Sequence, residues 1–367
     1  MSDLPNRSGP RPRPVLLGLS LGRVRHWYDG LGEFSRQLGL ALAAEAPRLA
    51  DELGWRLHFH LPRCWHGMFG DQVGYLDTHT SQRWLHLRAQ RFDLWHTVHQ
   101  HNRLRAPLGT RHQVETVHDL NFLHAKSPAK IERYRHILRR RLAQRDQAIA
   151  ITHYVAGDLA RELAPLATPV QVIHNGATDL TALPRQPIAA LAEGPPFLLH
   201  ISRLAPNKNI AALLDLAAAW PQQRLVLAGA TSDYTETVQR QVAERRLTNV
   251  HFQFDLDEGQ KAWLYAQCQG FLFPSLAEGF GLPPIEAMHF GKPVFLSRLT
   301  SLPEVGGDVA HYFDRFDGPA MRAVVQAGLA ADAEPGRAEA IAAHARRFTW
   351  ARCAAQHIGL YRRVLGD

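Results

Sequence analysis

Short apolar segments alternate with longer segments of helical length through the second half of this 367-residue chain. Strands that are joined by helices of this length form a parallel sheet with right-handed crossover connections. The pattern therefore predicts a Rossmann-like α/β domain. Its strands are expected at 197–201, 224–228, 249–253, 270–273 and 293–296, and its helices at 208–219, 233–246, 258–268 and 283–290.

The first half shows a less regular version of the same alternation, with residues 62–91 showing no clear period. Because the chain is too long for one ordinary hydrophobic core, two domains are expected. The first domain is predicted over 15–178, a proline-rich linker over 179–195 and the second domain over 196–347, and residues 1–14 are expected to be a disordered leader. Strands of the first domain are expected at 14–19, 56–61, 92–98, 113–120, 147–151 and 170–173.

One segment of the second domain combines a buried strand, a glycine loop and the start of a helix. The apolar run 270–273 is long enough only for a strand, and two prolines further on suit the first turn of a helix. Between them, Gly279 and Gly281 let the backbone approach a ligand, because glycine has no Cβ. Free amides at the start of a helix bind anions. Glu278 and Glu286 add carboxylates, which suit a ligand with hydroxyls as well as phosphates.

The sequence E-G-F-G-L-P-P-I-E, from Glu278 to Glu286, resembles the Glu-x7-Glu motif of the retaining nucleotide-sugar glycosyltransferases of family 4. The resemblance implies the GT-B fold, in which two Rossmann-like domains face each other across the active-site cleft. It implies that Glu278, Gly279 and Phe280 contact the donor sugar and that Glu286 accepts from the ribose diol. It also implies that residues 348–367 form a last helix that crosses back onto the first domain.

Two cations of the second domain are expected to bind the donor diphosphate. Arg203 and Lys208 lie five residues apart across a turn after strand 197–201, so both can converge on one ligand. This segment resembles the G-R-L…K-N element of the family, with Ser202 where glycine is usual. The amides of the second glycine loop, at Gly281 and Leu282, are expected to act with them.

His118 is the principal candidate in the first domain. It ends a predicted strand, and open α/β sheets bind ligands at the carboxyl ends of their strands. His118-Asp119 resembles the His-Asp motif of the family, in which the histidine approaches the donor sugar. His118 and Glu278 are therefore the expected catalytic residues, and Asp119 is expected to support the loop.

The first glycine loop of the chain, which contains Gly30 and Gly32, resembles the family's first Gly-rich loop, whose amides lie beside the donor phosphates. The chain departs from the family here, because Asp29 and Glu33 stand where adjacent glycines and a basic residue are frequent. The alternative is a simple tight turn from a strand into a helix.

No metal or other cofactor is expected. Asp255 and Asp257 look like the metal-binding Asp-x-Asp of a different glycosyltransferase fold, but Asp257 stands three residues before Gln260 in a capping-box arrangement. The histidines at 96, 99 and 101 have the spacing of a metal site but no cysteine or carboxylate cluster nearby. The positive charge that a metal would supply is assigned to Arg203 and Lys208.

Charge is concentrated in the first half. Residues 1–180 hold 24 Lys and Arg against 16 Asp and Glu, whereas the remainder holds 18 of each. A predicted helix over 126–145 is especially basic, and it is either a solvated face or a face that contacts an anionic membrane. Nucleic-acid binding is not expected, because no aromatic platform accompanies the charge. The residues of the membrane alternative are Lys126, Lys130, Arg133, Arg139, Arg140, Arg141 and Arg145.

Together these features predict a metal-independent transferase that moves a hexosyl group, with GDP-mannose as the favoured donor. The resemblance implies retention of anomeric configuration by same-face attack. The basic first domain suggests a lipid-linked, lipopolysaccharide or polysaccharide acceptor. A cytoplasmic location is expected, either free or at the inner face of the membrane, because the three cysteines are far apart and suggest neither a disulfide framework nor a zinc site. No membrane span is expected, because no apolar run approaches the roughly 18 residues that cross a bilayer. A nucleotide-sugar 2-epimerase of the same fold and a basic nucleic-acid-binding protein are the alternatives.

Overall fold

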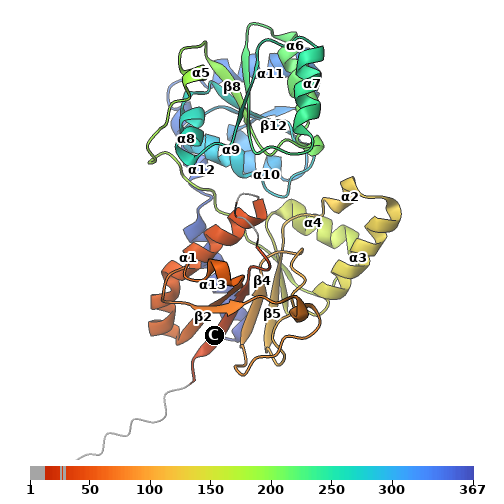
Figure 1. The fold of residues 1–367 in the computed structure, drawn as a ribbon, viewed down its shortest axis with the longest axis vertical. Coiled ribbons are helices and arrows are strands. Elements are labelled where there is room, and N and C mark those ends of the chain that lie inside the picture. Colours follow the sequence, from red (N-terminus) through yellow and green to blue (C-terminus); the bar gives the residue numbers. More distant parts are fainter. Residues whose placement is uncertain (1–12, 25–26, 28–29) are drawn as a thin grey trace, which may run out of the picture.

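The computed structural model describes residues 13–24, 27 and 30–367. Two parallel β-sheets, each with helices packed around it, form the two lobes in Figure 1. This is the two-domain Rossmann-like architecture that the sequence predicts. Most of the predicted leader, and Asp29 of the first glycine loop, lie outside the described residues.

The seven strands of the first sheet follow the order β3-β2-β1-β4-β5-β6-β7, and all its pairings are parallel. Helix α1 (Gly30–Leu53) lies beside this sheet and buries Phe34, Leu38 and Leu42, the apolar face expected from their helical spacing. The strands are β1 (Val15–Ser20), β2 (Trp55–Leu61), β3 (Gly74–Asp77), β4 (Leu94–Thr97), β5 (His112–Val117), β6 (Gln147–Ala150) and β7 (Val170–Val172). The remaining helices are α2 (Phe122–Ala125), α3 (Pro128–Leu142) and α4 (His153–Glu162).

The six strands of the second sheet follow the order β10-β9-β8-β11-β12-β13, again in parallel. The predicted strands and crossover helices are confirmed, with ends that differ by a few residues, and β13 is an additional strand. The strands are β8 (Phe197–Ile201), β9 (Arg224–Gly229), β10 (Val250–Phe254), β11 (Gly270–Phe273), β12 (Val294–Ser297) and β13 (His311–Phe313). The helices are α5 (Ala189–Ala192), α6 (Ile210–Ala219), α7 (Thr235–Glu244), α8 (Glu258–Gln267), α9 (Leu282–His289), α10 (Leu302–Gly306), α11 (Gly318–Ala331) and α12 (Arg337–Ala345).

The chain returns to the first domain in α13 (Trp350–Leu365), which is drawn in blue in the lower lobe of Figure 1. Thr349 caps the helix by accepting from the amide of Arg352 at 3.1 Å. The Tyr361 hydroxyl lies 2.7 Å from Nδ1 of His96 on β4, and both side chains are buried. The last helix is therefore part of the first domain's core.

The segment 62–91, for which the sequence predicts no structure, is mostly irregular. It contains the edge strand β3 and two short 3-10 helices, η1 (Arg63–Trp65) and η2 (Thr80–Arg83). All four residues of β3 are half-buried, so the strand lacks the alternating pattern that would reveal it. Among the residues that the structure describes, no helix is long and apolar enough to cross a membrane.

Candidate functional site

The glycine loop after β11 contacts the first domain at His118. A Cβ on Gly279 would lie 2.1 Å from the carbonyl oxygen of His118, so only glycine allows this approach. Thr152, at the start of α4, donates from Oγ1 to the carbonyl of Gly279 at 3.2 Å. The loop predicted to bind the donor sugar therefore lies against the backbone of the predicted catalytic histidine, His118.

Neighbouring segments hold this loop in a fixed shape. The amide of Glu278 donates to Oγ1 of Thr300, and the Ser301 hydroxyl lies 3.0 Å from the carbonyl oxygens of Glu278 and Phe280. Gly281 has a φ of +113° at the start of α9, a conformation that favours glycine. Pro283 and Pro284 follow in the first turn, as predicted. The amides at Gly281 and Leu282 therefore stand where the sequence places them, at the helix start.

Lys208 and Glu278 form an ion pair, with Nζ 2.5 Å from Oε1. Lys208 follows β8 and Glu278 follows β11, which are neighbouring strands of the sheet, so both side chains reach the same sheet edge. The Lys208 ammonium also lies 5.2 Å from the centre of the Phe273 ring. Arg203 is exposed after the same strand as Lys208.

Glu286 lies on α9 and is only 8 % exposed. The Tyr265 hydroxyl donates to its Oε2 at 2.7 Å, and Lys261 Nζ lies 3.7 Å from the same atom. The charge of Glu286, and less strongly that of Glu33 in the first domain, raises the pKa of Lys261. Lys261 and Tyr265 were not among the predicted site residues, and only their place on α8 could have suggested them as partners of Glu286.

His118 is a neutral imidazole in a buried setting. Its Nε2 lies 3.0 Å from the Val98 carbonyl oxygen, which can only accept, so Nε2 carries the proton and Nδ1 presents a lone pair. Burial lowers the pKa of His118 to about 3. The edge of the ring packs against Phe34 of α1, with centroids 4.4 Å apart.

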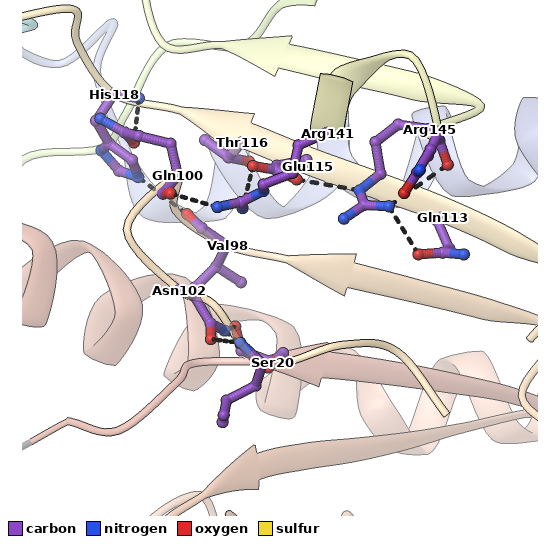
Figure 2. Close-up of polar contacts among 12 residues, drawn as sticks. Ser20, Val98, Gln100, Asn102, Gln113, Glu115, Thr116, His118, Arg141 and Arg145 are labelled. Carbon is purple, nitrogen blue, oxygen red and sulfur yellow. Dashed lines mark hydrogen bonds and ion pairs between the residues drawn. The ribbon is translucent and has the colours of Figure 1, made fainter. Parts of the chain in front are cut away.

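A hydrogen-bond network behind His118 fixes its backbone (Figure 2). Gln100 accepts from the His118 amide through Oε1 and donates from Nε2 to the Asp119 carbonyl, both at 3.0 Å. Arg141 of α3 donates from Nη1 to the carbonyl of Gln100 at 2.7 Å and forms an ion pair with Glu115. Gln100 was not among the predicted residues and Arg141 was predicted only as a surface cation, and no local pattern indicates their part in this network.

The network also corrects one prediction about the basic helix. Arg141 and Arg145 were counted with the surface charges, but both guanidinium groups bond the carboxylate of Glu115, which has no exposed area. Arg139 also turns inward, and its Nε donates to the Leu163 carbonyl at 3.1 Å. The members of the predicted set that are fully exposed are Lys126, Lys130, Arg133 and Arg140.

Within the described part of the chain, no group of three or more His, Cys, Asp or Glu side chains could hold a metal ion. His96 points into the core and bonds Thr116 and Tyr361, apart from His99 and His101. The carboxylate of Asp257 accepts from the amide of Gln260 at 2.7 Å, which is the capping box that the sequence predicts.

Gly32 of the first glycine loop is buried and lines a cavity in the first domain, whereas Gly30 is exposed at the start of α1. The structure thus groups His118, Gly279, Phe280, Glu278 and Lys208 at one junction between the domains. The roles assigned to these residues, and to Arg203, Gly281, Leu282 and Glu286, stay predictions.

Comparison with known proteins shows what parts of the chain are similar to. Residues 185–313 match the model described as "Glycosyl transferases group 1". The chain is 34% identical over 175 residues to the O-antigen chain mannosyltransferase B of Escherichia coli, covering 45% of each protein. It is 31% identical over 239 residues to the GDP-mannose:cellobiosyl-diphosphopolyprenol alpha-mannosyltransferase of Xanthomonas campestris, covering 60% of this chain and 61% of that protein. The chain thus spans about half to three fifths of the length of these two relatives.

A solved structure extends the likeness to both domains. The sucrose-phosphate synthase of Thermosynechococcus elongatus superposes with a TM-score of 0.72 at 22% identity, covering 97% of this chain and all of that one. At this identity the likeness concerns the fold alone, and it confirms the predicted GT-B architecture.

Proposed function

We propose that the chain transfers a hexosyl group from a nucleotide-diphosphate sugar to a glycan or lipid-linked acceptor, because residues 185–313 match the group 1 glycosyl transferase model. The observation that carries the proposal is the junction at Gly279. There the loop with the Glu-x7-Glu motif lies against the His118 backbone, and Lys208 and Glu278 lie at the adjoining sheet edge. GDP-mannose is the favoured donor, because the matched relatives are named as mannosyltransferases and one name specifies this donor.

The chemistry follows from the charges that develop during transfer. As the anomeric C–O bond breaks, negative charge grows on the nucleoside diphosphate and positive charge on the sugar. Arg203, Lys208 and the amides at Gly281 and Leu282 stabilise the leaving diphosphate as fixed donors. These groups supply the positive charge, so we propose that the reaction needs no metal.

Two further groups contact the sugar in this proposal. Glu278 accepts hydrogen bonds from hydroxyls of the donor sugar, and the Nδ1 lone pair of His118 accepts a hydrogen bond from another hydroxyl of the same sugar. His118 does not act as a general acid, because its Nε2 proton is committed to the Val98 carbonyl and its pKa is lowered to about 3 by burial. The acceptor hydroxyl attacks the same face that the diphosphate leaves, and the leaving phosphate takes its proton. The anomeric configuration is therefore retained.

The acceptor of the proposed reaction is a lipid-linked or polysaccharide glycan of the lipopolysaccharide type. Support comes from the basic first domain and from the names of the relatives, one of which has a diphosphopolyprenol acceptor. We place the enzyme in the cytoplasm at the inner face of the membrane. The exposed cations Lys126, Lys130, Arg133 and Arg140 would contact anionic headgroups there.

A thermal-shift panel tests the donor site. The full chain and the Arg203→Ala/Lys208→Ala double variant are heated with GDP, UDP, ADP or dTDP sugars without added metal. A ligand that binds only the folded state at a hundredfold excess over its Kd stabilises by about 2.7 kcal/mol. We expect one nucleotide to raise the Tm of the wild type and not of the variant. No shift with any nucleotide would refute the donor site, and conversion of the donor sugar without acceptor would identify an epimerase instead.

A further inference from the structure

A cavity of about 340 Å³ opens in the first domain. This volume is at the lower end of the range for small-molecule sites, about 300–1,000 Å³. Its walls come from the residues after β1, the first turns of α1, η2 and the loop 98–104. The same loop supplies Val98 and Gln100, which hold His118. The cavity and the candidate reaction centre therefore share one structural element.

Cationic side chains dominate the lining. Arg23, Arg83 and Arg103 lie around the cavity together with His99 and His101, and no carboxylate lines it among the described residues. In that part of the chain the three arginines also form no ion pair with a carboxylate, and Arg23 donates to the Thr80 hydroxyl at 3.0 Å. A concave site with arginines that lack carboxylate partners favours an anionic ligand.

A buried hydroxyl provides a second, independent indication. Ser35 on α1 is 1 % exposed and lines the cavity, and its Oγ has no hydrogen-bond partner among the described residues. Leaving a buried hydroxyl unpaired is unfavourable. A ligand oxygen in the cavity would supply the missing partner.

The walls are held by buried side chains, so the site is largely formed in advance. Asn102 donates from Nδ2 to the hydroxyl and the carbonyl of Ser20, at 2.8 and 3.1 Å (Figure 2). The Ser20 hydroxyl lies 2.9 Å from His60 Nδ1, and His60 Nε2 lies 3.0 Å from Gln82 Oε1. Gln82 directly precedes Arg83. This series of hydrogen bonds therefore links the loop 98–104 to Arg83 on η2. Preformed sites lose less entropy on binding.

The electrostatics connect the cavity with the junction between the domains. Burial raises the pKa of Asp119, whereas the charges of His101 and Lys208 lower it. Asp119 therefore lies within the field of a cavity residue and of a candidate donor residue. The cavity and the donor-side candidate Lys208 therefore both lie near Asp119.

We propose that this cavity binds a phosphate group of the acceptor and so positions the acceptor hydroxyl at the reaction centre. The inference rests on the proposed function, because it assigns the place of the second substrate. The phosphate has two chemical sources, a diphosphate on a polyprenyl chain or a phosphate ester on a sugar. Arg23, Arg83 and Arg103 supply the charged donors and Ser35 the neutral one.

Calorimetric titration of the full chain tests the proposal, with saturating GDP present to occupy the donor site. Farnesyl diphosphate and mannose 6-phosphate serve as probes of the two sources, and farnesol and mannose as uncharged controls. The variants are Arg23→Gln/Arg103→Gln and Ser35→Ala. Arg105→Gln is the matched control, because Arg105 is an exposed arginine of the same region that does not line the cavity.

We expect at least one of the two phosphorylated probes to bind. The probe that binds more tightly identifies whether the phosphate comes from a polyprenyl diphosphate or from a sugar phosphate. Each lost arginine should weaken it about tenfold, since charge-assisted hydrogen bonds are individually strong. Ser35→Ala should weaken it less and should not lower the Tm of the ligand-free protein, because its Oγ bonds no described residue. Binding of neither probe, or an equal loss in Arg105→Gln, would overturn the proposal. Absence of GDP binding would instead count against the donor site, so the two failures are distinguishable.

Discussion

Lys208 and Glu278 are paired with each other at 2.5 Å, although the sequence assigns them to different parts of the donor. The pair keeps both charges satisfied in a partly buried place, with side chains 18 % and 13 % exposed. In the proposed reaction, donor binding would replace this pair, giving the ammonium a phosphate and the carboxylate a sugar hydroxyl. Both groups would then already lie at the donor site before the donor binds.

A double-mutant cycle tests whether Lys208 and Glu278 bind the donor or only stabilise the fold through their ion pair. Lys208→Met should lower kcat about 100-fold or more, because it removes a donor to the leaving diphosphate. If both residues also bind the donor, Lys208→Met/Glu278→Gln will be slower than either single variant in steady-state assays. Recovery of activity in the double variant would show that the pair only stabilises the fold. Lys130→Met, at an exposed lysine of α3, is the control and should leave the rate unchanged.

Gly279→Ala should strongly reduce activity, because the new Cβ would meet the His118 carbonyl at 2.1 Å and push the two domains apart. Since the clash lies at the junction rather than in a core, we expect a small change in Tm alongside the loss of kcat/KM. The matched change Gly157→Ala, inside α4 with open space around it, should be neutral or stabilise by up to about 1 kcal/mol. Normal activity of Gly279→Ala would show that the contact with His118 is dispensable.

Gln100→Leu should lower kcat with little effect on the KM for the donor. The change removes the bonds to the His118 amide and the Asp119 carbonyl without removing a group that touches substrate. It leaves a buried amide unpaired, which costs about 1–3 kcal/mol in the free energy of unfolding. Chemical denaturation and steady-state kinetics measure the two effects. A change confined to stability would mean that His118 keeps its place without Gln100.

Arg141→Met should destabilise the first domain by about 3–5 kcal/mol, because it removes one partner of the fully buried Glu115. Arg140→Met, one residue earlier and exposed, should change the free energy of unfolding by less than about 0.5 kcal/mol. Urea denaturation of both variants makes the comparison. Equal stabilities would show that Arg145 alone satisfies the carboxylate.

These contacts mark where prediction from sequence succeeds and where it stops. The second domain was predictable because each strand is a continuous apolar run between helices, and the Glu-x7-Glu motif lies within one such unit. The partners of Glu115 lie 26 and 30 residues further along. Arg141 is on α3, next to the exposed Arg140, and Arg145 follows the end of that helix. Nothing local distinguishes Arg141 from Arg140. Which arginine turns inward depends on how α3 packs on the sheet, which is a tertiary property.

The same limit applies to the cavity. Arg83 lies in the segment 62–91, which has no hydrophobic period because it wraps the sheet edge in short turns. Its neighbour Gln82 is buried only because His60 and the chain around Asp77 surround it. A polar residue in an irregular segment gives no sign of such burial. The candidate donor groups were therefore predictable, whereas the walls of the first-domain cavity were not.

The pH dependence of stability gives a last prediction. Burial lowers the pKa of His118 and His60 to about 3, and that of His200 and His357 to about 4. These histidines are neutral when folded but take up protons on unfolding below their unfolded pKa of about 6.5. They therefore add no pH-dependent term to the free energy of unfolding above about pH 6.5, and they destabilise the folded state progressively as the pH falls towards 4.

Each such histidine contributes a slope of up to about 1.4 kcal/mol per pH unit in this window. The free energy of unfolding, measured by urea denaturation between pH 7 and 5, should therefore fall steeply. His357→Leu should reduce the slope by one histidine's share, since its Nδ1 contacts Cys353 of its own helix, at 2.8 Å from the carbonyl oxygen and 3.6 Å from Sγ. The variant should thus lose less stability than the wild type on acidification. An unchanged slope would mean that His357 is protonated in the folded state, against its burial in the first domain's core.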